Sequence, residues 1–181
     1  TYTYATFFNI KMMESYGYTA EALYDLVREG KWTIDKLSEI ASGIYTDVNG
    51  DGKADQDDIY GFGYNVVNPA DVWMTAFGQP LFTMNPDNTY DINFMSEKSV
   101  AILDKLLELH YNNKGVFLPP KQYDEQTFFL NGQYAMAPLR FHAAYTKLRD
   151  MEDPYSMLPY PKWDEEQSNY YTNADDKFSV F

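Results

Sequence analysis

The chain has 181 residues and a hydrophobic content of 45%, which suits a globular fold with its own core. Its 14 Lys and Arg stand against 27 Asp and Glu, a formal net charge of -13. This charge disfavours binding to nucleic acid or to an anionic membrane surface, because both present negative groups. The absence of cysteine excludes disulfides, thiol catalysis and cysteine metal sites.

The sequence shows neither the pattern of a membrane span nor that of a signal peptide. No apolar run approaches the roughly 20 residues that a membrane span needs. The chain begins TYTYATFFN, with neither an initiating Met nor a basic leader. We expect it to be an internal piece of a longer protein.

The first third of the chain predicts two strands separated by two helices and a polar loop. Residues 1–9 are rich in Thr, Tyr and Phe and predict a strand, and residues 59–64 predict another. Between them, residues 19–30 and 33–44 carry apolar side chains at helical spacing, and each run begins with a threonine suited to cap a helix. The acidic loop 47–58 joins the second helix to the second strand.

The rest of the chain continues this alternation of helices and short strands. The predicted elements are a helix over 69–78, a hairpin over 80–94, helices over 96–111 and 123–132, a strand over 133–138, a helix over 140–151 and a strand over 155–161. A polar loop and a last short strand over 177–181 follow. The order predicts an α/β fold with helices around a short mixed sheet.

The acidic loop, DVNGDGKADQDD, has the ligand spacing of an EF-hand calcium loop. Its predicted ligands, with Lys53 acting through its carbonyl, are Asp47, Asn49, Asp51, Lys53, Asp55 and Asp58. Gly52 stands where the loop turns sharply, and hard oxygen ligands of this number favour Ca²⁺ over Mg²⁺. Asp58 has less reach than the usual glutamate at the last position, so we expect a weak site with a Kd of roughly 10⁻⁵ to 10⁻³ M.

The surroundings of this loop argue against a calcium sensor. An EF-hand places a helix on both sides of its loop, whereas here a strand follows. The sequence also contains no second loop of this kind. The prediction is therefore a structural calcium ion that braces a turn.

The remaining composition favours binding over catalysis. The chain contains 17 Tyr, 12 Phe and 3 Trp, and aromatic rings stack on the C–H faces of sugars, although most aromatic residues belong to a core. His110 and His142 have no neighbouring catalytic pattern, and neither a G-x-S-x-G motif nor a phosphate-binding glycine loop is present. We expect a protein that is not an enzyme.

Several segments, in the same order along the chain, resemble the extracellular solute-binding proteins of ABC importers, in the carbohydrate-type family that includes maltose-binding protein. These segments are TFFN (6–9), LYDLVREGKWTIDKLSEIA (23–41), VWMTAFGQPLF (72–82), FFLNGQYAMAP (128–138) and YSMLPYPKWDEEQSNYY (155–171). The resemblance implies one lobe of a two-lobed periplasmic-binding-protein-like fold. Residues 1–161 would form most of the second lobe, and residues 162–181 a polar loop and crossing strand towards a missing first lobe.

The resemblance also implies a function. It predicts a sugar or oligosaccharide clamped between the two lobes, ABC permease subunits as partners, and an extracellular or periplasmic location with a lipid anchor on a bacterial surface. Carried over onto this sequence, the ligand-binding positions are Trp73, Phe8, Arg140, Phe141 and His142.

Two other interpretations remain open at this point. The loop, the acidity and the aromatic content would also suit a calcium-stabilised module of a secreted glycoside hydrolase or cellulosome-like protein. That interpretation predicts a second calcium loop, which the sequence lacks. A surface interaction domain without a small ligand is the third.

Overall fold

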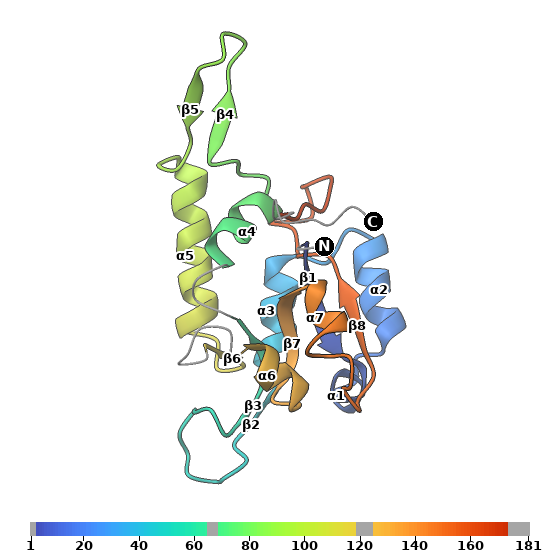
Figure 1. Ribbon diagram of the computed structural model, residues 1–181. Helices are drawn as coiled ribbons and strands as arrows, with labels where there is room; N and C mark the ends of the chain where they lie inside the picture. Colours follow the sequence, from blue (N-terminus) through green and yellow to red (C-terminus); the bar gives the residue numbers. More distant parts are fainter. Residues whose placement is uncertain (1–2, 65–68, 119–124, 174–181) are drawn as a thin grey trace.

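The computed structural model describes residues 3–64, 69–118 and 125–173, and its body is a mixed sheet covered by helices (Figure 1). The strands of this sheet are β1 (Tyr4–Asn9), β2 (Tyr45–Thr46), β3 (Ile59–Gly63), β6 (Val116–Phe117), β7 (Tyr134–Arg140) and β8 (Tyr155–Leu158). Their order is β2-β3-β7-β1-β8, with β6 paired to β3. Strand β3 runs parallel to β6 and β7, whereas β1 runs antiparallel to β7 and β8. The predicted α/β class with a short mixed sheet is confirmed.

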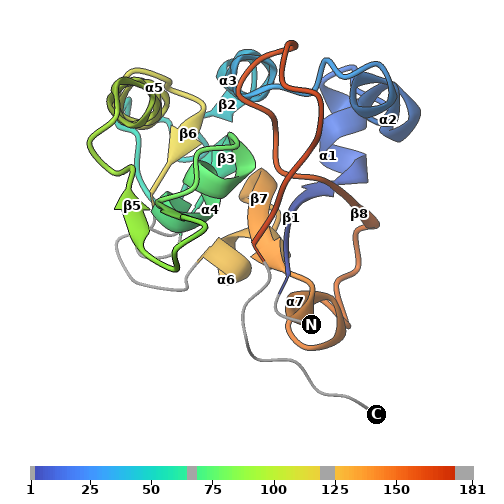
Figure 2. The same ribbon diagram turned by 90° about the horizontal axis from the view of Figure 1, so that it is seen from above.

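Helices lie on both faces of the sheet (Figure 2). The described helices are α1 (Ile10–Ser15), α2 (Ala20–Arg28), α3 (Ile34–Ser42), α4 (Pro69–Ala76), α5 (Glu97–Tyr111), α6 (Glu125–Leu130) and α7 (His142–Tyr145). Seen from above, α1, α2 and α3 cover one face, and α6 and α7 cover the other. None of the helices in the described ranges is long and apolar enough to cross a membrane.

Three helices begin where their capping residues predict. The side chains of Thr19, Thr33 and Ser96 each accept a hydrogen bond from the backbone N–H three residues later, at 3.2, 3.2 and 3.1 Å. Each bond satisfies one of the N–H groups that the first turn of a helix leaves unpaired. The local sequence therefore determines where these three helices begin.

The core is divided between the two faces of the sheet. Phe7 and Phe8 are neighbours in β1, and both are completely buried because their side chains point to opposite faces. Phe8 packs against Tyr24 of α2, and Phe7 packs against Phe129 of α6. A strand covered on both faces has no alternation of buried and exposed residues, which is why β1 is buried without a break from Ala5 to Asn9.

Helix α3 approaches the sheet closely because two glycines stand beneath it. A Cβ atom on Gly61 would lie 2.5 Å from the backbone of Ala41, and one on Gly115 would also collide with it. Any larger residue at these positions would push α3 away from β3 and β6. This contact fixes the helix that leads into the acidic loop.

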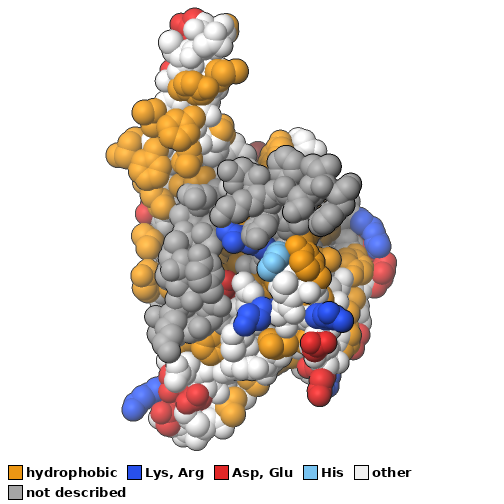
Figure 3. All heavy atoms as spheres, viewed as in Figure 1, with side chains coloured by type: hydrophobic (Ala, Val, Ile, Leu, Met, Phe, Trp, Pro, Cys, Tyr) orange, Lys and Arg blue, Asp and Glu red, His pale blue; other side chains and the backbone are white. Residues whose placement is uncertain are grey.

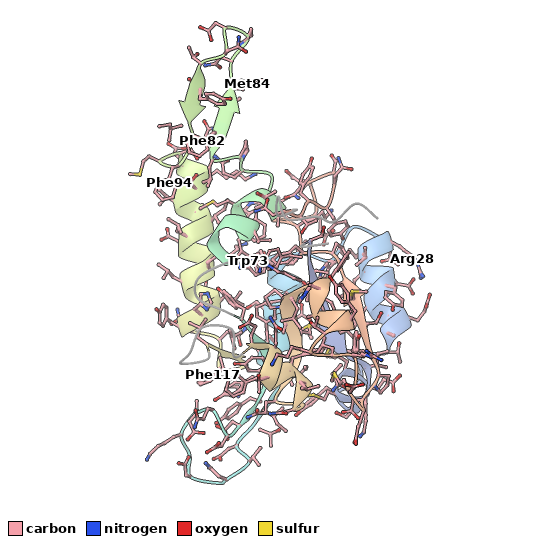
Figure 4. The ribbon with its side chains drawn as sticks, viewed as in Figure 1. Arg28, Trp73, Phe82, Met84, Phe94 and Phe117 are labelled. Carbon is pink, nitrogen blue, oxygen red and sulfur yellow. The ribbon has the colours of Figure 1, made fainter. Side chains whose placement is uncertain are left out.

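Two segments project from the body at opposite ends (Figure 1). One is the acidic loop between β2 and β3. The other is the hairpin of β4 (Phe82–Met84) and β5 (Tyr90–Ile92), which confirms the predicted hairpin. Phe82 faces Ile92 and Met84 faces Tyr90 across the hairpin, and all four side chains are exposed (Figure 4).

One predicted helix is largely wrong. The helix expected over 140–151 is replaced by the end of β7 and the short α7. Arg140 pairs with Tyr4 of β1, and the N–H of Phe141 donates to the carbonyl of Thr3 at 2.9 Å. This long-range pairing extends the strand, and it outweighs the helical pattern of the local sequence.

The remaining differences concern short elements and ranges outside the described residues. The short strands β2 and β6 were not predicted, and β8 ends three residues before the predicted strand 155–161. Of the predicted helix 123–132, the structure describes Glu125–Leu130 as helical. The strand predicted over 177–181 lies outside the described residues. The division of the chain at residue 161 stays a prediction.

Candidate functional site

One end of the sheet gathers three strand ends and the tail of the described chain. The first residue of β1, Tyr4, stands opposite the last residue of β7, Arg140. The end of β8, Leu158, stands opposite Thr6. The hydroxyl of Thr172 donates to the carbonyl of Tyr4 at 2.9 Å, so the tail returns to the start of β1. Segments far apart in sequence therefore meet at this end.

A cavity of about 320 Å³ opens here, which we call the aromatic pocket. It is lined by Thr3, Tyr4, Ala5, Phe141, Met157, Leu158, Pro159, Tyr170, Tyr171 and Thr172. The side chains of Phe141 and Tyr171 are 37% and 44% exposed, so their rings are available to a ligand. Concave sites lined by aromatic rings with a few polar groups are typical of small-molecule binding.

Arg140 and Tyr4 form a positioned pair beside this pocket. The Nε of Arg140 donates to the hydroxyl of Tyr4 at 2.8 Å, and the guanidinium carbon lies 5.1 Å from the centre of the Tyr4 ring. A hydrogen bond and a cation–π contact at the same pair hold the guanidinium in one orientation.

A second cavity of about 470 Å³, the basic pocket, is lined in part by Arg140 at the end of the same strand. Its described lining consists of Gln126, Arg140, His142, Ala143, Thr146 and Lys147. Figure 3 shows a histidine flanked by Lys and Arg side chains on the face that carries α7. Arg140 lines the basic pocket and the next residue, Phe141, lines the aromatic pocket, so the two cavities are neighbours.

His142 contacts Thr146 in the basic pocket. The hydroxyl of Thr146 donates to the carbonyl of His142 at 2.8 Å. The same oxygen lies 3.3 Å from Nδ1 of the His142 ring. These contacts order both side chains along the pocket wall.

Three of the five predicted ligand positions are brought together. Arg140, Phe141 and His142 line the two neighbouring pockets. Phe8 is completely buried in the core and Trp73 is 1% exposed, so neither presents a ring surface in the described structure. Contact between these two residues and a ligand stays a prediction.

Trp73 of α4 is instead connected to the pocket through other aromatic rings. Its ring lies 5.0 Å from Tyr160, and Tyr160 lies 6.4 Å from Tyr4, both in edge-on geometry. The indole N–H of Trp73 has no hydrogen-bond partner among the described residues. The chain of ring contacts from Trp73 through Tyr160 thus ends at Tyr4, which lines the aromatic pocket.

Sequence reasoning missed Tyr4, Tyr170 and Tyr171 as pocket residues. The tyrosine pair in SNYYT was visible, but its place depends on the tail returning to β1, across 168 residues of sequence between Tyr4 and Thr172. No local pattern encodes such a contact. Composition gave only the general signal of many tyrosines.

The acidic loop lies at the other end of the molecule, and its side chains brace its own backbone. The carboxylate of Asp47 accepts from the N–H groups of Gly50 and Gly52, at 2.7 and 2.8 Å. Asn49 and Asp51 each accept from the N–H two residues later. Such side-chain turns shape the loop without a bound ion.

Asp58 closes the loop from inside. It is fully buried and accepts from the N–H groups of Val48 and Asp55 and from the hydroxyl of Tyr45, at 3.1, 3.3 and 3.1 Å. Burial acts to raise the pKa of Asp58, but these hydrogen bonds outweigh it and the pKa is lowered. Within the described residues no group of three acidic or histidine side chains is arranged to hold a metal ion. Calcium binding stays a prediction.

A third cavity, of about 530 Å³, lies between α3 and α5. Lys105 on its wall donates to Asp35 at 2.9 Å and lies 4.4 Å from the ring of Trp163. Charges of both signs line this groove, and Lys105 and Asp35 form an ion pair in it.

No protein-family model matches the sequence, and the comparison with curated proteins found no match. Solved structures do match. The maltose/maltodextrin-binding domain MalE of Bdellovibrio bacteriovorus bound to maltotriose is 16% identical, and the match covers 94% of this chain and 39% of that one with a TM-score of 0.65. The ABC substrate-binding protein Lmo0181 of Listeria monocytogenes in complex with cycloalternan is 19% identical, with 88% and 37% covered and a TM-score of 0.63.

A third match is an ABC transporter solute-binding protein of Thermotoga lettingae bound to alpha-D-tagatose. It is 17% identical, with 88% and 39% of the two chains covered and a TM-score of 0.64. The chain thus spans less than two fifths of each of these proteins. None of the three is a module of a glycoside hydrolase, so the interpretation as a calcium-stabilised module of a secreted glycoside hydrolase or cellulosome-like protein gains no support. The described chain has the α/β fold of part of a lobe of the ABC-transporter solute-binding proteins, as the sequence resemblance predicted.

Proposed function

We propose that the chain is one lobe of the solute-binding component of an ABC importer, and that it binds a sugar or oligosaccharide against a second lobe. The observation that carries the proposal is the aromatic pocket at the end of the sheet where the tail meets β1. The fold supports it, because the similar solved proteins are solute-binding proteins bound to maltotriose, cycloalternan and tagatose.

The chemistry of the pocket suits a carbohydrate. The exposed rings of Phe141 and Tyr171 offer flat apolar faces for sugar C–H groups. The hydroxyl of Tyr4 and the guanidinium of the neighbouring Arg140 supply polar groups beside these rings. Apolar faces combined with a few placed polar groups give both affinity and orientation.

The mechanism we propose is hinge closure of two lobes around the solute. A solute that contacts both walls binds the closed state better than the open state, and it therefore shifts the population towards closure. ABC permease subunits would recognise the closed form. We place the protein outside the cytoplasmic membrane, extracellular or periplasmic with a lipid anchor, and we assign it no catalytic residue.

The calcium loop belongs to this proposal as a structural part. Its predicted ligands lie between β2 and β3, at the end of the sheet opposite the aromatic pocket (Figure 1). An ion at this distance would stabilise the lobe without touching the solute. We therefore propose that calcium affects stability and leaves the choice of solute unchanged.

The test is a panel of sugars and oligosaccharides titrated calorimetrically into the complete protein. Phe141→Ala and Tyr171→Ala should each lower the affinity for the sugar that binds, by about 10-fold, since stacking and ring burial are lost. Tyr111→Ala is the matched control, because Tyr111 is 76% exposed on α5 and lines neither pocket. The proposal is wrong if no member of the panel binds, or if the control loses as much affinity as the pocket variants.

A further inference from the structure

The basic pocket is unusual for this chain. The sequence has 14 Lys and Arg against 27 Asp and Glu, so a surface patch drawn at random would be acidic. Yet Arg140 and Lys147 line one cavity together with His142, and none of its described lining residues is acidic. Glu125 precedes Gln126 in α6, but Glu125 is buried and does not line the cavity.

The pocket also has a neutral donor. The amide of Gln126 on α6 lines the same cavity as the two cations, whereas the hydroxyl hydrogen of Thr146 is used in its bond to the carbonyl of His142. The lining is drawn from α6, β7 and the segment around α7. Arg140 is held by its bond to Tyr4, and His142 is held by its bond to Thr146. Cations and N–H or O–H donors converging on one cavity are what a carboxylate, sulfate or phosphate group needs.

The position of the pocket connects it to the solute. Arg140 and Phe141 are consecutive at the end of β7, and they line the basic and the aromatic pocket respectively. A solute whose ring rests on Phe141 would therefore carry its substituents towards Arg140. We infer that the basic pocket is a subsite for an anionic group of the solute, and that the solute is an acidic saccharide. This inference rests on the proposed function.

The inference is tested with matched pairs of probes on the complete protein. The pairs are methyl glucoside with methyl glucuronide, methyl galactoside with methyl galacturonide, and glucose with glucose 6-phosphate, each titrated calorimetrically. In at least one pair the acidic member should bind about 10-fold tighter or more, because charge-assisted hydrogen bonds are the strong ones. The carboxylate and phosphate pairs separate the two kinds of anionic group.

Substitutions then assign the effect to the pocket. Lys147→Gln, at an exposed position, should lower the affinity for the acidic member by about 5-fold or more and leave the neutral member unchanged. Arg140→Gln should also lower the affinity for the acidic member. Lys98→Gln makes the same charge change at an exposed position of α5 outside the pocket and should change neither affinity.

The outcomes separate this inference from the proposed function. If neutral members bind and their acidic partners bind no tighter, the subsite is wrong and sugar binding stands. If Lys147→Gln and Lys98→Gln weaken acidic binding equally, the effect is one of net charge and the subsite is wrong. If no member of any pair binds, and the wider sugar panel also fails, the proposed function and the subsite fall together.

Discussion

His110 is the residue whose surroundings predict most clearly how the stability of the fold depends on pH. It lies on α5 with its ring centre 4.1 Å from that of Tyr64, and its Nδ1 has no hydrogen-bond partner among the described residues. Burial lowers the pKa of His110 to about 4 from its usual value of 6.5. The packed, neutral imidazole is thus part of the contact between α5 and the end of β3.

This lowered pKa predicts a loss of stability in mild acid. The unfolded chain takes up the proton near pH 6.5, whereas the folded chain takes it up only near pH 4. The contribution of His110 to the free energy of unfolding is therefore fully present above pH 6.5, and it is lost as the pH falls towards 4. Between pH 7 and pH 5 the free energy of unfolding should fall by about 2 kcal/mol on this account.

Urea unfolding of the wild type and of His110→Gln at the two pH values measures the effect. The variant should lose less stability between pH 7 and pH 5 than the wild type, although it is less stable at pH 7. His142→Gln is the control and should show the full wild-type loss, because His110 is still present. Equal losses in all three proteins would contradict a neutral, buried His110.

At the scale of elements, the sequence predicted the helices and turns that depend on residues close together in the chain. Helices α2, α3 and α5 follow their Thr or Ser caps, and the hairpin follows its turn. The stretch 140–151 failed because its helical pattern competes with pairing to β1, a partner more than 130 residues away. Tyr171 and Thr172 were not predicted as pocket residues for the same reason, because their place in the pocket depends on the tail returning to Tyr4.

The buried positions of Phe8 and Trp73 carry a related lesson. A resemblance places a residue on the right element, but its exposure depends on the packing of every element around it. Phe8 lies beneath α2, and Trp73 lies against Tyr160. Arg140 and Phe141 lie where β7 ends, and each of them lines a cavity.

The acidic loop is the element whose stability should respond to an ion. For the Kd range predicted from its ligands, 1 mM calcium would stabilise the fold by about 0.4 to 2.7 kcal/mol. Thermal unfolding in calcium and in EGTA should therefore differ by about one to ten degrees. Asp51→Asn keeps a hydrogen-bond acceptor for the N–H of Lys53 while removing a ligand charge, so it should reduce the difference.

Asp57→Asn is the matched control for the loop. Asp57 is exposed and is not among the predicted ligands, so this variant should keep the full calcium effect. Identical melting curves of the wild type in calcium and in EGTA would show that the loop is closed by its own hydrogen bonds alone. The bonds of Asp47 and Asp58 to the loop backbone make that outcome physically coherent.

At the scale of the whole molecule, the two projecting segments and the pockets occupy separate regions. The sheet places the acidic loop at one end and the strand ends Tyr4, Arg140 and Leu158 at the other (Figure 1). The body between them has its own core, because buried side chains lie on both faces of the sheet. If the proposed function is correct, calcium-dependent stability and solute contact belong to different parts of one chain.

This arrangement predicts how residues 1–181 behave when produced alone. They should fold cooperatively, with near-ultraviolet circular dichroism from packed rings such as Phe7 and Phe129 and a single urea transition. They should bind the solute at least about 100-fold more weakly than the complete protein, since losing a wall that contributes only 3 kcal/mol already has that effect. Calorimetry on both proteins measures the ratio.

Equal affinities would show that one lobe suffices, and the two-lobed mechanism would then be wrong. A chain that stays unfolded would show instead that the core between the two helical layers depends on contacts outside these residues.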